Sequence, residues 1–367
     1  MSEPSTESVP SSILWDVIRY VIVAVAVGFL VWYYCIYTPV VYVSREHIGK
    51  TMGTDYIVKV ARFPEKADWR EVSAVIQQRL DSLDQAMSTY RHDSEVCRFN
   101  EFSSTEDWFP VSQDTALLVQ TSLEISRLTD GTFDITIAPL VRHWGFGAAG
   151  SQRPSRSFEE LQSATSLLKE QTGYEKLSVR IDPPALKKQI PKLEIDLSAI
   201  GKGFAVDCIA TLLEERKMTD YLIEIGGEVR SKGKKSKEKD WTVGIEKPAG
   251  TSSHEFPGLH QAFSLKDQSL ATSGNYLQTR QVGDRQISHI IDPRTGLPAH
   301  VESGADEFAA VAVLAPACTQ ADAWATALFV LGEQKGRELA DQQGLAVLFL
   351  LRRDNEIVEL PSKRWKN

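Results

Sequence analysis

One short segment, residues 195–207 (IDLSAIGKGFAVD), constrains the fold more than any other part of the chain. Its pattern predicts a strand that ends at Asp196, followed by a tight turn and a helix with two early glycines, Gly201 and Gly203. The first turn of a helix has free N–H groups and a partial positive charge, and glycine lets a phosphate approach the backbone closely. The spacing is neither that of a Walker A loop nor that of a G-x-G-x-x-G fingerprint. The segment therefore indicates either a different nucleotide site or glycines that serve packing alone.

The length and charge of the chain narrow its class. Its 367 residues are enough for one large or two medium domains. A net charge of -8 argues against nucleic-acid binding. The basic run 232–239 is predicted to be a solvated loop, with a membrane-surface or partner contact as the alternative. The four cysteines are far apart and form no C-x-x-C pair, which argues against a disulfide framework or a cysteine-ligated zinc site.

The N-terminal region predicts a membrane anchor. No charged side chain occurs between Arg19 and Arg45, and this apolar run is long enough to cross a bilayer, which needs about 20 residues. We expect a tail over residues 1–16 and an uncleaved single-span helix over residues 17–43, with a buried core helix as the weaker alternative. The count of flanking positive charges slightly favours a cytoplasmic position for the globular part.

Apolar periodicity predicts alternating strands and helices from about residue 50 onward. The expected helices cover residues 67–87, 112–128, 157–168, 199–216 and 319–331, and the expected strands cover residues 56–61, 221–225, 241–245, 262–265, 288–291 and 308–314. Consecutive strands are mixed with separated helices in this order. The pattern therefore favours an α+β fold over a regular doubly wound sheet.

Asp322 and Thr326 lie four residues apart on a predicted helix, so they share one face. Carboxylate and hydroxyl oxygens are hard ligands that suit Mg²⁺ or Ca²⁺ better than zinc. Thr319 is expected to cap the N-terminus of this helix. A surface aspartate with a packed threonine is the simpler interpretation, but the helix is so apolar that a buried Asp322 would need a partner.

His289 is expected on a strand that runs into the turn formed by residues 292–296 (DPRTG). Its imidazole could act as a general base. A lone histidine is more often structural, and Asp292 before a proline is most simply a turn residue.

Three further segments carry groups that could bind a planar ligand. Phe133 and Asp134 follow a turn in extended conformation, so the ring could stack on a ligand while the carboxylate accepts a hydrogen bond from it. A core aromatic residue is the alternative for Phe133. Tyr90 follows a helix end and could also stack, or simply pack. The paired glycines at residues 226–227 could let the backbone approach a ligand, and a bulge explains them equally well.

Together these segments resemble the ApbE family of flavin transferases (FAD:protein FMN transferases). The resemblance extends from about residue 50 to residue 360, and eight motifs occur in the family's order. The matching stretches are Met52-Gly53-Thr54, MSTYRHDSEVCRFN, TDGTFDITIAPLVRHWGFG, IDLSAIGKGFAVD, YLIEIGGEVRSKG, SLATSGNY, HIIDPRTGLP and ADAWATALFVLG.

The resemblance implies an ApbE-type (T-fold-like) mixed sheet-and-helix domain over residues 44–360, with a C-terminal tail over residues 361–367. It implies an enzyme that binds FAD with Mg²⁺, transfers FMN to a threonine hydroxyl of an acceptor protein and releases AMP. Acceptors in the family are flavin-carrying subunits of sodium-pumping or electron-transporting membrane complexes. Because these partners act on the outer face of a bacterial inner membrane, we expect the soluble domain in the periplasm, against the slight charge count. The alternatives are an FAD pyrophosphatase that uses water as acceptor and a non-catalytic, membrane-tethered FAD-binding protein.

The family's pattern also implies roles for individual residues. His289 would be the catalytic base. The carbonyl group of Ala199 and the side chains of Asp322 and Thr326 would bind the metal. The residues that would contact FAD are Met52, Tyr90, Thr132, Phe133, Asp134, Asp196, Lys202 and Ile290. Lys202, at the start of the glycine-rich helix, can also offset phosphate charge.

Overall fold

The structure, a computed structural model, describes residues 11–33, 41–147, 157–248, 258–275, 279–283, 285–300, 306–353 and 356–366. The chain divides into two compact units, of which one comprises residues 1–43 and 64–67 and the other comprises residues 44–63 and 68–367.

The first unit contains helix α1 (Ser11–Val31). In the part of the chain that the structure describes, no helix is long and apolar enough to cross a membrane. The transmembrane helix expected over residues 17–43 is therefore not confirmed, and residues 34–40 of that segment lie outside the described residues.

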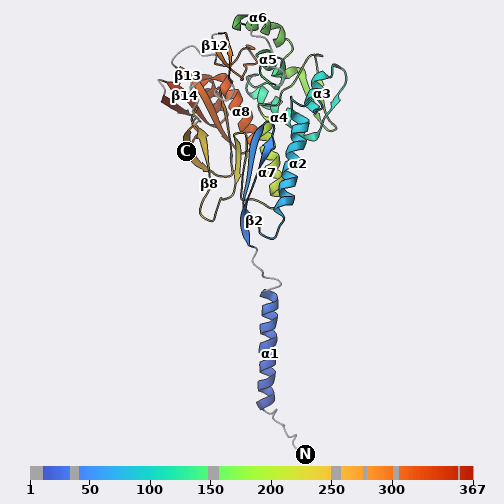
Figure 1. Ribbon diagram of the computed structural model, residues 1–367, viewed down its shortest axis with the longest axis vertical. Coiled ribbons are helices and arrows are strands. Elements are labelled where there is room, and N and C mark those ends of the chain that lie inside the picture. Colours follow the sequence, from blue (N-terminus) through green and yellow to red (C-terminus); the bar gives the residue numbers. More distant parts are fainter. Residues whose placement is uncertain are drawn as a thin grey trace, which may run out of the picture. The chain divides into compact units, whose positions relative to one another are not determined.

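The second unit is built on an eight-stranded sheet with the strand order β1-β2-β6-β7-β10-β13-β14-β15 (Figure 1). These strands are β1 (Tyr42–Thr51), β2 (Thr54–Pro64), β6 (Tyr221–Ile225), β7 (Glu228–Lys232), β10 (Ser269–Gly274), β13 (Asp306–Ala315), β14 (Ala346–Arg353) and β15 (Glu356–Pro361). From β2 to β15 each neighbouring pair is antiparallel. The predicted α+β class is thus confirmed, because a doubly wound fold would need parallel strands.

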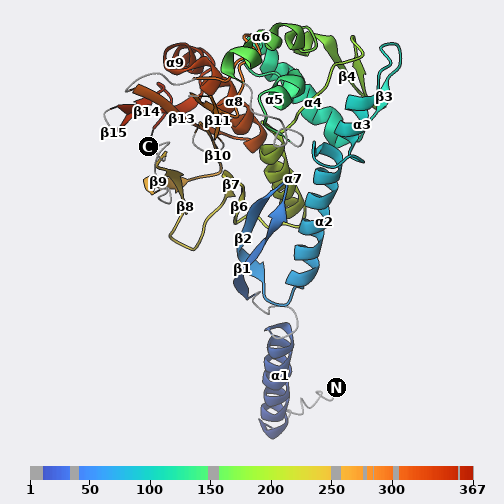
Figure 2. The same ribbon diagram turned by 45° about the horizontal axis from the view of Figure 1, so that its top comes forward.

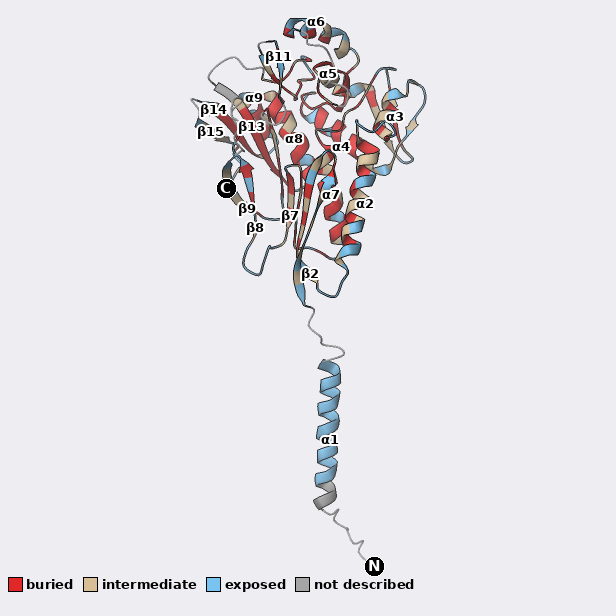
Figure 3. Cartoon of the chain, in the orientation of Figure 1, coloured by how far each residue is buried: buried red, intermediate tan, exposed pale blue. Residues whose placement is uncertain are grey.

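The two faces of this sheet carry different cores. Val311 and Val313 of β13 belong to the main core, whereas Ala310 and Ala312 belong to a smaller one, because successive side chains of a strand point to opposite faces. The helices that contribute to the main core include α2 (Trp69–Met87), α3 (Glu95–Glu101), α4 (Gln113–Leu128), α7 (Gly201–Glu215), α8 (Cys318–Leu331) and α9 (Glu333–Gln342). The hairpin of β8 (Trp241–Glu246) and β9 (Leu259–Leu265) contributes to the smaller core. Figure 3 shows the buried residues concentrated in the sheet and in the helices packed on it, with α8 buried over most of its surface.

A third group of buried residues, which we call the satellite core, lies apart from the sheet. It forms between α5 (Ala138–His143), α6 (Phe158–Lys169) and the hairpin of β11 (Thr279–Val282) and β12 (Arg285–Ser288) (Figure 2). Its members are Leu140, Trp144, Phe146, Phe158, Leu161, Val282, Ile287 and Ile291. A small sheet of β3 (Phe109–Pro110), β5 (Pro184–Lys188) and β4 (Leu177–Ile181) completes the unit, with single 3₁₀ turns at Ile135–Ile137 and Tyr174–Lys176.

The predicted helices match the observed ones to within two residues at each end. The side chain of Asp68 accepts a hydrogen bond from the backbone N–H of Arg70, so α2 begins two residues later than expected. Ser157 and Glu160 form the reciprocal pair of hydrogen bonds typical of a capping box at the start of α6.

Two expected strands are wrong. The segment ending at Asp196 has no strand neighbour; instead, the side-chain amide of Asn100 bonds both the N–H and the carbonyl of Ile195, at 2.8 and 2.9 Å. The strand expected over residues 288–291 stops at its first residue, because Ser288 Oγ accepts a hydrogen bond from the N–H of Ile290 at 3.0 Å. In both places a side chain, which periodicity does not report, takes over the backbone hydrogen bonds.

Candidate functional site

Helices α7 and α8 cap each other. Ile200 precedes α7 and offers no side-chain cap, but the backbone N–H of Gly203 donates to Oδ2 of Asp322 in α8 at 2.9 Å. Ala317 precedes α8 and likewise offers none, but Asp207 in α7 accepts hydrogen bonds from the first two backbone N–H groups of α8, at 3.0 and 2.9 Å. Each helix therefore carries the carboxylate that satisfies the free N–H groups of the other.

The expected cap at Thr319 is wrong for the same reason. Thr319 lies inside α8, and both its N–H and its hydroxyl donate to Oδ2 of Asp207, at 2.9 and 2.6 Å. The sequence signal for Asp207 was weak, because its partners lie more than a hundred residues away in the chain. Only the contact between the two helices shows which carboxylate caps which end.

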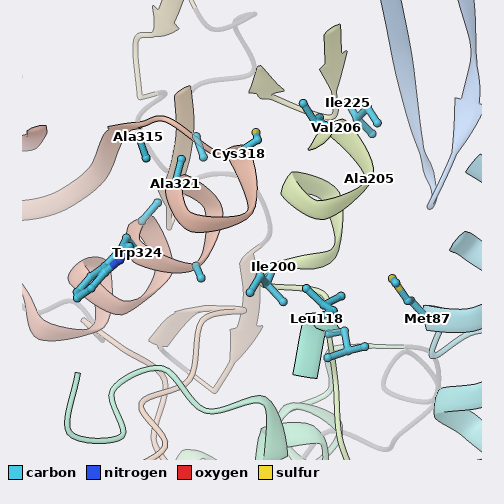
Figure 4. Close-up of a cluster of buried hydrophobic side chains, with 14 of the residues drawn as sticks. Met87, Leu118, Ile200, Ala205, Val206, Ile225, Ala315, Cys318, Ala321 and Trp324 are labelled. Atoms are coloured by element: carbon cyan, nitrogen blue, oxygen red, sulfur yellow. The ribbon is translucent and has the colours of Figure 1, made fainter. Parts of the chain in front are cut away.

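The two glycines at the start of α7 have different reasons to be there. A Cβ atom on Gly203 would lie 2.4 Å from the carbonyl oxygen of Cys318, so the close contact with α8 requires a glycine. A Cβ atom on Gly201 would meet nothing within 4 Å. Figure 4 shows the apolar side chains around this junction, among them Ile200 and Cys318. Packing thus explains Gly203, whereas no neighbouring atom requires a glycine at the buried position 201.

Asp322 is buried, which contradicts the interpretation of a surface aspartate: its exposed fraction is 4%. Burial raises the pKa of this carboxyl group, whereas nearby Lys202 and the Gly203 N–H favour its charged form. One turn further along α8, the hydroxyl of Thr326 lies 3.1 Å from that of Ser273 in β10. Asp322 and Thr326 therefore join α8 to α7 and to the sheet respectively.

Lys202 lies between two acidic groups. Its Nζ donates to Oε2 of Glu228 at 2.5 Å and to the carbonyl oxygen of Gly226 at 3.3 Å. Burial by itself lowers the pKa of Lys202, but Glu228 and Asp322 outweigh it, so the pKa is raised. Burial, together with the charge of Asp322, raises the pKa of Glu228 above its ordinary range despite the pairing with Lys202.

These residues fit a divalent cation. Two buried carboxyl groups, Asp322 and Glu228, share one ammonium group, so ionising both leaves a negative charge that a bound cation would neutralise. Asp322, Thr326 and the main-chain carbonyl of Ala199, in the turn before α7, supply only oxygen donors, as Mg²⁺ prefers. The described residues contain no group of three or more His, Cys, Asp or Glu side chains placed to hold a metal, so a metal here would rely on hydroxyl and carbonyl oxygens as well.

A second part of the site lies where Asp196 meets the segment that contains Asp134. The N–H of Asp196 donates to the carbonyl oxygen of Ile135 at 2.7 Å, and its Oδ1 accepts from the N–H of Ser198 at 2.8 Å. Asp134 accepts from the N–H and hydroxyl of Thr136 and from the N–H of Tyr174. Burial raises the pKa of Asp134 to about 6, against these hydrogen bonds.

The neighbours of Asp134 are turned inward. Phe133 is 2% exposed and belongs to the main core, which favours the alternative that it is a core aromatic residue. The hydroxyl of Thr132 is also buried and donates to the carbonyl oxygen of Thr129 at 3.0 Å. Of the three, only Asp134 carries a charge, and its carboxylate bonds within the protein.

Sequence reasoning missed two residues that hold the Asp196 segment. Besides Asn100, described above, Lys188 is completely buried and donates through Nζ to the carbonyl oxygens of Phe99 and Leu193, at 2.9 and 2.8 Å. Burial lowers the pKa of Lys188 to about 8. A lysine in a short strand gives no sequence signal of such a role, because its partners are main-chain carbonyls.

Met52 lies in the tight turn between β1 and β2, where both Met52 and Gly53 have positive φ, 49° and 75°. The N–H of Gly226 donates to the carbonyl oxygen of Asp55 at 3.2 Å, so this turn lies beside the β6–β7 turn to which Lys202 bonds. Tyr90, in contrast, is 67% exposed, just after α2.

His289 is half-buried and lies at the edge of the satellite core. It lies in a bend directly after β12, and its ring contacts that of Phe146 edge to face, with centroids 6.3 Å apart. The next residue, Ile290, is buried in the main core, and Ile291 is buried in the satellite core, so this segment runs between the two cores. Asp292 is a turn residue as expected: its carbonyl oxygen accepts from the N–H of Gly296 at 2.7 Å.

The comparisons with known proteins agree with this fold. The model of the ApbE family matches residues 52–349. FAD:protein FMN transferase from Vibrio cholerae serotype O1 is 36% identical over 318 residues, which cover 87% of this chain and 90% of the relative. The enzyme of the same name from Escherichia coli K12 is 35% identical over 321 residues, or 87% of each chain.

Solved structures are similar over the same region. The flavin transferase ApbE from Vibrio cholerae superposes with a TM-score of 0.75 at 34% identity, covering 89% of this chain and 99% of that one. The apo form of the flavinyl transferase ApbE from Pseudomonas stutzeri gives a TM-score of 0.75 at 31% identity, covering 88% and 95%. With its mixed α+β fold and the matched residues 52–349, the chain belongs to the ApbE family of transferases.

Proposed function

We propose that this protein transfers FMN from FAD to a threonine hydroxyl of an acceptor flavoprotein subunit, with Mg²⁺, and releases AMP. One observation carries the proposal: the N-terminus of α7, Lys202 and the buried carboxylate of Asp322 meet at one point. A helix N-terminus and an ammonium group attract phosphate, and a buried carboxylate attracts the cation that accompanies it. The relatives named FAD:protein FMN transferase support the choice of substrate.

In the proposed reaction, the threonine oxygen attacks the phosphorus atom of the FMN moiety, and the bond from that phosphorus to the oxygen of AMP breaks. His289 takes the proton of the threonine hydroxyl, and Lys202 offsets the charge on the phosphate oxygens. Ala199, Asp322 and Thr326 would hold Mg²⁺, which supplies charge neutralisation on the pyrophosphate when bound. The residues proposed to contact FAD are Met52, Tyr90, Thr132, Phe133, Asp134, Asp196, Lys202 and Ile290.

The test is to incubate the full chain with FAD, Mg²⁺ and a threonine-bearing acceptor domain, and to follow the acceptor by mass spectrometry. We expect covalently bound FMN on the acceptor and one AMP released for each transfer. Free FMN without modified acceptor would instead establish the alternative of an FAD pyrophosphatase.

The variant His289→Ala separates an enzyme from a non-catalytic FAD-binding protein. We expect its transfer rate to fall on the order of 10²–10⁴-fold while FAD binding is retained, because the base acts on the acceptor hydroxyl and not on FAD. Tight FAD binding with no AMP release by the unaltered protein would favour the non-catalytic alternative.

We also propose that residues 17–43 attach the transferase unit to a bacterial inner membrane, with the unit in the periplasm, and that residues 44–360 form that unit. Support comes from the apolar side chains that α1 exposes, which include Val17, Val21, Ile22, Val23, Val25, Val27, Phe29, Leu30 and Val31. The proposed acceptors are subunits of sodium-pumping or electron-transport complexes. Cell fractionation tests whether the protein is attached to the membrane. Protease digestion of intact and permeabilised cells tests on which side of the membrane the transferase unit lies. Recovery of the full chain in the soluble fraction would refute the attachment.

A further inference from the structure

Glu228 has no role in the function proposed above, yet it is among the most deeply buried charged residues of the site. It is 2% exposed, and Lys202, at the second position of α7, donates to its Oε2 at 2.5 Å. A buried carboxylate is costly, and removing one partner of such a pair leaves an uncompensated charge. Its position beside Lys202 therefore needs an explanation in terms of what Lys202 does.

Two carboxylates, those of Glu228 and Asp322, lie near the ammonium group of Lys202. The charges of both Glu228 and Asp322 act on its ammonium group, but the hydrogen bond goes to Glu228. Asp322 instead accepts the backbone N–H of Gly203. If the ammonium group paired with Asp322, it would occupy the carboxylate that the proposed cation needs, because Lys donates through a flexible stem with three N–H groups.

The turn before β7 fixes Glu228 in its place. Gly226 and Gly227 both have positive φ, 56° and 99°, and join β6 to β7 in a tight hairpin. The N–H of Gly227 donates to Oε1 of Glu224 at 2.8 Å, and the carbonyl oxygen of Gly226 accepts a second bond from Lys202 at 3.3 Å. The hairpin thus presents two acceptors to the ammonium group of Lys202, the Glu228 carboxylate and the Gly226 carbonyl oxygen, whereas Asp322 in α8 is bonded to the N–H of Gly203.

We propose that Glu228 is a positioning residue that holds the Nζ of Lys202 away from Asp322, so that Asp322 stays available to a divalent cation. This inference rests on the proposed Mg²⁺ site. It predicts that Glu228 acts only through Lys202. A purely electrostatic role, in which Glu228 attracts the cation by its own charge, makes the opposite prediction, because that attraction would persist without the lysine.

A double-mutant cycle distinguishes the positioning role of Glu228 from a purely electrostatic one. Mg²⁺ binding to the full chain with FAD is measured by titration calorimetry for the unaltered protein, Glu228→Gln, Lys202→Met and the double variant. We expect Glu228→Gln to weaken Mg²⁺ binding about tenfold when Lys202 is present and less than about twofold in the Lys202→Met background. Equal weakening in both backgrounds, or no weakening in either, would overturn the proposal.

Two further variants control for poor folding of Glu228→Gln and for a general effect of altering the hairpin. Glu228→Asp keeps a carboxylate for Lys202 and should restore most of the Mg²⁺ affinity, which also keeps the test decisive if Glu228→Gln folds poorly. Glu224→Gln removes the charge of another carboxylate in the same hairpin, but the glutamine still has an oxygen that can accept the N–H of Gly227. This variant should bind Mg²⁺ as the unaltered protein does. Weakening by Glu224→Gln equal to that by Glu228→Gln would mean that the hairpin, and not the ion pair, is responsible.

The readout does not depend on the proposed reaction. If the unaltered protein binds Mg²⁺ and FAD but modifies no acceptor, the proposed function fails while the cycle still decides the role of Glu228. If transfer occurs and the cycle shows additive effects, the function stands and the role of Glu228 as a positioning residue is refuted.

Discussion

The two halves of the candidate site are held in different ways. At the α7–α8 junction, the carboxylates of buried Asp322 and half-buried Asp207 bond directly to the ends of the helices, beside residues of the main core. His289 lies at the edge of the satellite core, and ring contacts and single hydrogen bonds link its segment to α5 and the residues that follow that helix. The difference suits the proposed transfer of FMN: charges that must be neutralised need fixed partners, whereas the proposed proton acceptor would have to meet a hydroxyl that arrives on another protein.

Within the α7–α8 junction, Asp207 and Asp322 perform the same structural task in different surroundings. Asp207 also pairs with Arg230 at 2.5 Å, so its charge is balanced. Asp322 is more deeply buried and shares Lys202 with Glu228. The carboxylate of Asp207 thus serves the fold alone, whereas that of Asp322 can also bind a ligand.

The largest expected effect is the loss of activity in Asp322→Ala. A metal-binding carboxylate contributes several kcal/mol to transition-state stabilisation, so we expect metal-dependent transfer to fall on the order of 10⁴-fold. The assay is FMN transfer over a range of Mg²⁺ concentrations, with circular dichroism as the control for folding. Unchanged activity and Mg²⁺ dependence would show that Asp322 only caps α7, and the contrast with Asp207 would disappear.

The next effect concerns Asp134 and pH. Because burial raises its pKa to about 6, the native state binds more protons than the unfolded state between about pH 4 and pH 6. The contribution of Asp134 to the free energy of unfolding therefore falls as pH rises through this window, by up to about 3 kcal/mol.

Urea unfolding of the unaltered protein and of Asp134→Asn, each at several pH values, tests this prediction. The effects of the other titrating groups cancel when the free energies of unfolding of the two proteins are subtracted. We expect the stability of the unaltered protein relative to Asp134→Asn to decrease from pH 4 to pH 6. A difference that is constant with pH would show that folding does not raise the pKa of Asp134.

Asp207→Ala should affect stability first and catalysis second. It removes the hydrogen bonds to the start of α8 and leaves Arg230 without its closest partner, so we expect a loss of about 2 kcal/mol in the free energy of unfolding. Asp207→Asn, which keeps one acceptor, should lose less. Thermal unfolding measures both variants. A loss of transfer larger than the loss of stability explains would mean that the two aspartates are not divided between folding and chemistry as we argue.

The sequence predicts the features that residues close together in the chain determine. Helix periodicity and local caps such as Ser157 are set within a few residues, so the helix positions and the α+β class follow from them. The burial of Asp322 does not, because the sequence favoured a surface aspartate. The roles of Asp207, Asn100 and Lys188 do not, because each has at least one partner about ninety or more positions away in the chain. The failed strand at residues 195–196 has the same origin: Asn100 replaces a neighbouring strand.

The smallest expected effect tests the satellite core. The indole N–H of Trp144 donates to the carbonyl oxygen of Gly296 at 2.7 Å, a buried bond that ties α5 to the turn following His289. Trp144→Phe removes this bond and should lower the free energy of unfolding by about 1 kcal/mol. Because His289 is proposed to act on the acceptor, we expect a lower kcat with unchanged FAD binding, measured by flavin fluorescence. A matched weakening of FAD binding would mean that the satellite core shapes the flavin site itself, and the two halves of the site would then not be separable.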